Sequence, residues 1–315
     1  MTAPEPTDLS STAPSTLAIR SEAVAAQLAS NDPLGAGPAR AYQLCLDVGK
    51  DRLRLCVAEP PVSGPGPTAC CWLEEYTFPT LVTDFPVLPA LKALAQKHPV
   101  LQAQGWKHIV VSVNTPSFTL VPQALFRREY AAHYLQLPRG SALPATEQTH
   151  SYAHPDEGFQ SVFNLDIRLQ DWLAAAFPLQ PLTVLHQTSM LLHASREVGT
   201  AGATLVLYFE DEYVTLVFRH EGALRFCNKF AYKHASDLVY YVLFVMGELK
   251  AQPEQVDVRL YGEITPFADS YGLLARFLPR LSFGTRPADL ALSEPFEELP
   301  EHRHAALFAL AFLRQ

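Results

Sequence analysis

The sequence predicts an α/β protein made of two duplicated βββαβ halves, with a subdomain inserted in the first half. Two observations carry this prediction. Three strand-like runs, a helical pattern and a further apolar run occur early in the chain, and the same order recurs later. A length of 315 residues suits two domains, and a hydrophobic content of 48% is enough for each to bury a core.

The first half begins with three strands that form a meander. These are expected at Tyr42–Asp47, Arg52–Val57 and Cys70–Phe78, with turn or loop residues between them. A helix is expected from about Pro86 to Lys97, and a buried strand follows at His108–Val113.

The second half repeats this order. Its strands are expected at Thr204–Phe209, Tyr213–Arg219, Ala223–Phe230 and Val256–Tyr261. The helix before the last strand has apolar residues three and four positions apart from Ala235 to Leu249, so one of its faces should pack on a sheet.

The remaining residues set the predicted domain division. Residues 1–38 are rich in Pro, Ala, Ser and Thr and are expected to form a disordered N-terminal tail. The first half spans 39–198 and contains the inserted subdomain at about 115–166, with a helix expected at Leu125–Leu135. The second half spans 199–315 and ends in a helix, Arg303–Leu313, that should dock on the body of the protein.

Composition argues against several classes of protein. The net charge is −8 and basic residues do not cluster, so no nucleic-acid partner is expected. The N-terminal residues lack a secretory pattern, and the longest apolar stretch, Leu238–Met246, is too short to span a membrane. A cytoplasmic protein is therefore predicted. The five cysteines contain no CxxC pair and are interpreted as buried, reduced thiols.

Short motifs within this order carry a family resemblance. They are Leu44-Cys45-Leu46-Asp47-Val48-Gly49, Phe118–Pro122 with Leu125-Phe126, Val162–Leu165, and Leu260-Tyr261-Gly262-Glu263-Ile264. The chain resembles the bacterial domain-of-unknown-function family 3822, which has the actin-like ATPase (ribonuclease-H-like) fold of the actin, hexokinase and Hsp70 superfamily. It is similar in plan to the pilus-assembly and secretion-platform members. The resemblance implies that fold but no reaction.

The resemblance also implies a nucleotide cleft between the halves. In active superfamily members, a hairpin in each half presents Asp-x-Gly and small hydroxyl residues, whose N–H groups hold phosphates while an aspartate holds hydrated Mg²⁺. The first hairpin keeps Asp47 and Gly49, but Lys50 and Asp51 replace the hydroxyl residues. The second hairpin, Glu210-Asp211-Glu212, has three carboxylates and no glycine. Such charges repel a triphosphate unless a metal neutralises them.

The cleft candidates are therefore Asp47, Gly49, Asp211 and Gly262, the last lying where the superfamily holds adenosine. The alternative interpretation is that Asp47-x-Gly49 is an ordinary hairpin turn and Gly262 a strand-to-helix turn. No catalytic residue, metal ligand or resident cofactor is predicted, although ATP with Mg²⁺ remains an alternative ligand.

Other chemistry receives little support from the sequence. A two-metal nuclease site would need carboxylates beside Asp47 that cannot be identified in the first half. His150 and His154 fit a surface hairpin better than a metal or acid–base site. No nucleophile elbow surrounds Ser189, and the two histidines near the last helix, His302 and His304, are expected in solvent.

Two functions follow from these observations. The favoured one is a non-catalytic actin-like binding or scaffold protein, a pseudo-ATPase with eroded nucleotide motifs and an unidentified protein partner. Its contacts are expected in the inserted subdomain, from Tyr130 to Phe163. The alternative is an ATP-binding conformational switch or weak ATPase whose halves close on Mg-ATP.

Overall fold

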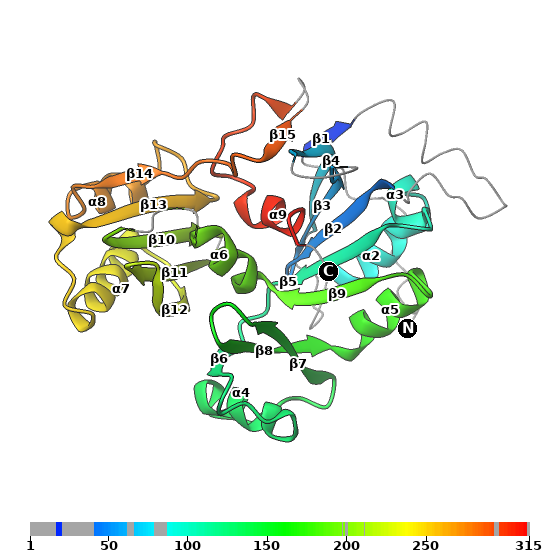
Figure 1. Cartoon of the computed structure of the whole chain (residues 1–315), viewed down its shortest axis with the longest axis horizontal. Helices are drawn as coiled ribbons and strands as arrows, with labels where there is room; N and C mark the ends of the chain where they lie inside the picture. Colours follow the sequence, from blue (N-terminus) through cyan, green and yellow to red (C-terminus); the bar gives the residue numbers. More distant parts are fainter. Residues whose placement is uncertain are drawn as a thin grey trace, which may run out of the picture.

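The computed structural model describes residues 17–20, 41–61, 66–78, 87–196, 198, 201–210, 212–292 and 296–313. Two larger sheets lie on either side of a central pair of helices, and a small third sheet lies apart from both (Figure 1). No described helix has the length and apolar character needed to cross a membrane.

The first sheet has the strand order β1-β4-β3-β2-β5-β9, and β15 also pairs with β4. Its strands are β1 (Leu17–Arg20), β2 (Gln43–Val48), β3 (Arg52–Glu59), β4 (Thr68–Thr77), β5 (His108–Val113), β9 (Leu182–His186) and β15 (Leu290–Leu292). The strands β2, β3 and β4 form the predicted antiparallel meander, and β5 and β9 run parallel to β2.

The second sheet repeats the plan in the order β12-β11-β10-β13-β14. Its strands are β10 (Ala203–Phe209), β11 (Tyr213–His220), β12 (Ala223–Ala231), β13 (Val256–Gly262) and β14 (Leu281–Phe283). The meander β10-β11-β12 is antiparallel, whereas β13 is parallel to β10, as β5 is to β2. The prediction of two βββαβ units is confirmed.

Helices cover both faces of these sheets. On the outer side of the first sheet lie α2 (Val87–Ala95), α3 (Pro99–Gln102) and α5 (Ile167–Ala176); on that of the second lie α7 (Ala235–Glu248) and α8 (Asp269–Ala275). Between the two sheets lie α6 (Gln187–Ser195) and α9 (Ala305–Leu310), as Figure 1 shows. Because their buried residues contribute to the cores on the inner faces, these two helices hold the halves together.

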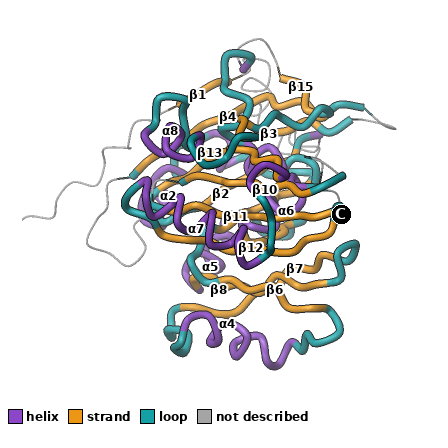
Figure 2. Tube along the Cα trace, turned by 90° about the vertical axis from the view of Figure 1, so that its left-hand side faces the viewer, coloured by secondary structure: helices purple, strands orange, loops and turns teal. Residues whose placement is uncertain are grey.

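The third sheet, β6-β8-β7, belongs to the segment predicted as an insertion. It contains β6 (Phe118–Pro122), β7 (Glu147–His154) and β8 (Phe159–Asp166), and it packs against α4 (Ala131–Arg139). Figure 2 shows this unit below the two larger sheets. The predicted helix at Leu125–Leu135 begins too early, because a turn and the 3-10 helix η2 (Arg128–Tyr130) precede α4.

The edge of β4 is covered by two short strands that the sequence did not predict. β1 pairs with it antiparallel at Trp72–Glu75, and β15 pairs with it parallel at Thr68–Cys70. β1 lies within the stretch that was expected to be disordered, so that expectation was wrong for Leu17–Arg20. The strand is held on β4 by Arg20, which lies over the Trp72 ring and forms an ion pair with the buried Glu74. The rest of that stretch lies outside the described residues.

The last part of the chain also completes the first sheet. Although the predicted division assigns residues 199–315 to the second half, β15 pairs with β4, and α9 packs on β2, β3 and β5. This packing agrees with the expectation that the last helix docks on the body. The short 3-10 helix η3 (Pro253–Gln255) leads into β13.

Candidate functional site

The ends of the parallel strands define the site. Ligands of open α/β sheets bind beyond the carboxyl ends of the strands, and here those ends from both sheets face one another. Asp47 lies near the end of β2, Asn114 follows β5, and Gln187 follows β9. Glu210 follows β10 in the second sheet, and Glu263 follows β13.

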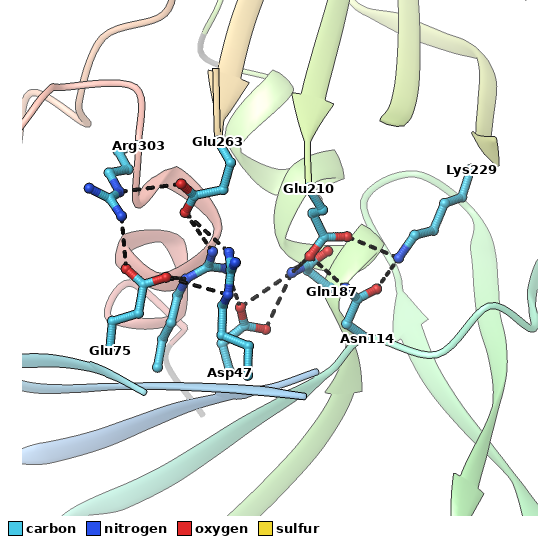
Figure 3. A network of polar contacts seen from close by, with 10 residues as sticks. Asp47, Glu75, Asn114, Gln187, Glu210, Lys229, Glu263 and Arg303 are labelled. Carbon is cyan, nitrogen blue, oxygen red and sulfur yellow. Dashed lines mark hydrogen bonds and ion pairs between the residues drawn. The ribbon is translucent and has the colours of Figure 1, made fainter. Parts of the chain in front are cut away.

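Asp47, a predicted cleft candidate, is bound by the protein's own side chains. It is 4% exposed and lies opposite Arg54 of the neighbouring strand β3. Arg54 Nη1 is 3.3 Å from Asp47 Oδ2, and the Gln187 amide donates to the same carboxylate at 3.3 and 3.4 Å (Figure 3). Burial raises the pKa of Asp47, and the Arg54 charge only partly opposes this rise.

The turn after Asp47 does not depend on glycine. The Gly49 N–H donates to the Arg52 carbonyl at 2.8 Å and closes the hairpin. A Cβ added to Gly49 would come no closer than 3.4 Å to its neighbours, an ordinary contact, and the residue is not among the glycines with positive φ. The structure therefore gives no steric reason for glycine at position 49, and Gly49 stays a predicted cleft candidate.

In the second hairpin, the cleft candidate Asp211 lies outside the described residues. The preceding residue, Glu210, is the one whose carboxylate contacts side chains of the first half. The Glu210 carboxylate accepts from Lys229 Nζ at 3.0 Å, from Asn114 Nδ2 at 2.5 Å and from Gln187 Nε2 at 3.2 Å. Burial alone would raise the pKa of Glu210, but Lys229, Arg54 and these hydrogen bonds hold it below its ordinary value. Glu210 is thus an ionised carboxylate with a full set of partners.

Gln187 joins the two hairpins. It is 1% exposed, and its single amide group donates to both Asp47 and Glu210. This neutral side chain comes from the first turn of α6 and bridges the two carboxylates.

A second group of contacts extends this network across the halves. Arg54 Nη2 donates to Glu263 Oε1 at 2.8 Å, and Arg54 Nε to Glu75 Oε1 at 3.3 Å. Arg303, just before α9, lies 3.2 Å from Glu75 and 3.6 Å from Glu263. Figure 3 shows these acids and guanidinium groups converging from both sheets and the C-terminal segment. Arg54 is 3% exposed and is the central cation of this group.

Gly262 has a structural reason to be glycine. Its φ is +83°, and an added Cβ would lie 2.2 Å from the Phe209 carbonyl oxygen. The next residue, Glu263, donates its backbone N–H to that same oxygen at 2.9 Å. The close approach of β10 and β13 thus requires Gly262 and directs Glu263 toward Arg54, in the segment where the resemblance implied adenosine.

A cavity of about 480 Å³ adjoins the network. It lies between the two hairpins and the inserted subdomain, and of the three cleft candidates that the structure describes, Gly49 is among its lining residues and Asp47 and Gly262 are not. Its charged lining includes Lys50, Asp51, Arg168, Glu210, Glu212 and Lys229. The described lining therefore carries charges of both signs, whereas a site for a triphosphate favours a mainly cationic lining.

The described residues contain no group of three or more His, Cys, Asp or Glu side chains arranged to hold a metal ion. Ser189 bonds to His154 Nε2 at 3.1 Å, but both are buried, and burial lowers the pKa of His154 to about 4. This pair is an interior hydrogen bond without access for a substrate. The five cysteines are free thiols; Cys45, Cys56 and Cys70 are buried, as predicted, whereas Cys71 and Cys227 are only half-buried.

Sequence reasoning was wrong about His304. It was expected in solvent but is 1% exposed, and burial together with Arg54, Arg303 and Arg52 drives its pKa well below the ordinary value. His302 is half-buried and bonds to the Ile264 carbonyl at 2.8 Å. The C-terminal segment therefore contributes directly to the network between the halves.

Comparison with solved structures defines the class. A Bacteroides thetaiotaomicron VPI-5482 protein with actin-like ATPase fold and unknown function superposes with a TM-score of 0.71 at 15% identity, covering 88% of this chain and 97% of the other. The type IV pilus biogenesis complex PilM–PilN contains a chain that superposes with a TM-score of 0.62 at 16% identity, covering 86% and 98%. The protein therefore has the actin-like ATPase fold.

The family follows from the sequence match. A family model described as "Protein of unknown function (DUF3822)" matches residues 34–281. The chain belongs to this family, which confirms the resemblance found in the sequence. No curated protein matches the chain.

Proposed function

We propose that this protein is a non-catalytic, cytoplasmic actin-like scaffold whose former nucleotide site is filled by its own side chains and which binds a protein partner. One observation carries the proposal: the carboxylates of both hairpins are bridged by Gln187, and Arg54 ties the first hairpin to Glu263 of the second half. A triphosphate entering this space would meet Asp47, Glu210 and Glu263, and it would have to displace their present partners.

We place partner binding on the inserted subdomain. Large apolar side chains are exposed there: Leu125 is 66%, Tyr130 53% and Leu137 83% exposed. These exposed side chains, from the turn before η2 to α4, support the choice of this side of the subdomain. The solved chain that superposes on this protein with a TM-score of 0.62 belongs to the PilM–PilN complex, and that complex supports the idea of a protein partner.

The competing function is an ATP-responsive switch, and the cavity of about 480 Å³ beside both hairpins is the observation in its favour. Thermal unfolding with and without Mg-ATP separates the two functions. A ligand at a hundred times its Kd adds roughly 2.7 kcal/mol of stability, which raises Tm by several degrees. On the scaffold proposal, millimolar Mg-ATP leaves Tm unchanged.

Asp47→Ala and a non-hydrolysable ATP analogue are the controls. An increase in Tm that both ATP and the analogue produce, and that Asp47→Ala abolishes, would reject the scaffold in favour of the switch. Once a partner is known, charge substitutions at Leu125, Tyr130 and Leu137 should weaken its binding in a pull-down. Unchanged binding by all three variants would reject the proposed surface.

A further inference from the structure

Three side chains that meet between the halves combine an amine, a carboxamide and a carboxylate. Lys229 lies on β12 and Glu210 follows β10, both in the second sheet, whereas Asn114 follows β5 of the first. Lys229 Nζ contacts Asn114 Oδ1 and lies 3.0 Å from Glu210 Oε2. Asn114 Nδ2 donates to Glu210 Oε1 at 2.5 Å. Each of the three groups therefore contacts the other two, as Figure 3 shows.

The contact between Lys229 and Asn114 brings a nucleophile close to an acyl carbon. A C=O bond is about 1.2 Å long, so an amine nitrogen that contacts Oδ1 lies within about 4 Å of Cγ in the same carboxamide. Reacting atoms in a near-attack geometry are about 3–3.5 Å apart, and a small rotation of either side chain closes the difference. The lysine amine is therefore almost in position to attack the side-chain amide.

We propose that these two side chains react and form an isopeptide bond between Lys229 and Asn114. A bond forms between Nζ and Cγ, and the bond between Cγ and Nδ2 breaks. The protonated amine carries three protons and keeps one in the new amide, so the other two leave with Nδ2 as an ammonium ion. Atoms and charge balance between these two groups, and the chain itself supplies both reactants.

Glu210 is placed to move the protons. Its Oε2 faces the attacking nitrogen at 3.0 Å, and its Oε1 faces the leaving nitrogen at 2.5 Å. The ionised carboxylate can accept a proton from Nζ, which frees the lone pair for attack, and can pass it to Nδ2, which improves the leaving group. Glu210 is therefore the general base and the general acid of the reaction. Because each chain reacts only once, a slow rate suffices.

The surroundings also favour the reaction. The side chain of Lys229 is 5% exposed and that of Glu210 12%, so little water competes for the amine. The Tyr213 ring lies beside Nζ, with its centroid 4.7 Å away. Burial disfavours the charged forms of an amine and a carboxylate, which lowers the cost of proton transfer between them. All three reacting residues line the cavity of about 480 Å³, which gives the released ammonium a way out.

The bond joins the two halves covalently, since Asn114 belongs to the first and Lys229 to the second. It does not rest on the proposed scaffold function, because neither a partner nor a nucleotide enters the reaction. The competing interpretation is an ion pair in which the same contacts persist and no bond forms. The mass of the chain separates the two, because only the reaction removes ammonia.

The intact mass of the full-length protein is therefore the test. We expect the wild-type chain to be lighter than its sequence mass by one ammonia molecule. Trypsin should then release a branched peptide in which residues 108–127 are joined to 226–233, because trypsin does not cleave after an acylated lysine. A wild-type mass equal to the sequence mass would overturn the proposal. So would an ammonia loss confined to a linear peptide, since asparagine cyclisation produces that result.

Four variants test the assigned roles. Lys229→Arg keeps the positive charge and Asn114→Ala removes the amide, so each variant should have the full mass of its own sequence. Glu210→Gln keeps both reactants but removes the proton carrier, and it should also abolish the branched peptide; if the peptide persists, the role given to Glu210 is wrong. Lys50→Arg is the matched control, because Lys50 lines the same cavity, and this variant should keep the ammonia loss. Circular dichroism of each variant separates loss of the reaction from loss of the fold.

Discussion

Replacing Arg54 by methionine should destabilise the protein strongly. Arg54 is 3% exposed and contacts Asp47, Glu75 and Glu263, and the first two of these acids are themselves less than 5% exposed. Removing one partner from a buried ion pair leaves an uncompensated charge, which costs about 3–5 kcal/mol. At about 2–4 °C per kcal/mol, Tm should fall by roughly 6–20 °C.

Urea unfolding at neutral pH, followed by circular dichroism, measures this loss. Arg168→Met is the control: Arg168 pairs with Asp166, but its side chain is 50% exposed, so its removal should cost less than about 1 kcal/mol. Lowering the pH should shrink the Arg54→Met deficit, because burial raises the pKa of Asp47 and its protonated form no longer needs a cation. A deficit no larger than that of Arg168→Met, or one independent of pH, would refute the reasoning.

Three further predictions concern single sites. Burial lowers the pKa of His186 to about 3, so between about pH 3 and pH 6.5 the unfolded chain binds one more proton than the folded chain. The free energy of unfolding should therefore fall as the pH falls through this range. His186→Asn should make this dependence of stability on pH shallower by up to about 1.4 kcal/mol per pH unit. Gly262→Ala should cost several kcal/mol in urea unfolding, whereas Gly272→Ala, where a Cβ meets nothing within 4 Å, should be neutral or slightly stabilising; equal effects would contradict the close approach. Burial raises the pKa of Cys71 and of Cys227 to about 12, so a thiol reagent at pH 8 should label both only after unfolding, and fast labelling of the native protein would contradict this.

The fold could be predicted because its periodicities are local. Alternating or continuous apolar runs located β2–β5 and β10–β13, and the pattern from Ala235 to Leu249 located α7. The strands that cover β4 were missed for the opposite reason. β1 and β15 are three or four residues long, and they form because a partner edge exists far away in the sequence, which no local pattern reveals.

The site was predicted only in part for the same reason. Asp47 was found through a motif, but its partners Gln187 and Glu263 come from distant segments that only the fold brings together. Arg54 did leave a signal: a basic residue inside the apolar strand Arg52–Val57 needs a buried counter-charge. Gly262 was found for a functional reason, and the structure gives it a steric one.

These contacts also bear on how the halves could move. Separating the two sheets would break the contacts of Glu263 with Arg54 and Arg303 and of Gln187 with Glu210, in addition to the packing of α6 and α9. A ligand shifts such an equilibrium only by the difference between its affinities for the two states. A nucleotide would have to recover the free energy of those contacts at a site whose carboxylates repel its phosphates. On the proposed function, the chain keeps its halves in one fixed arrangement, which suits a protein that presents a surface to a partner better than one that cycles with a ligand.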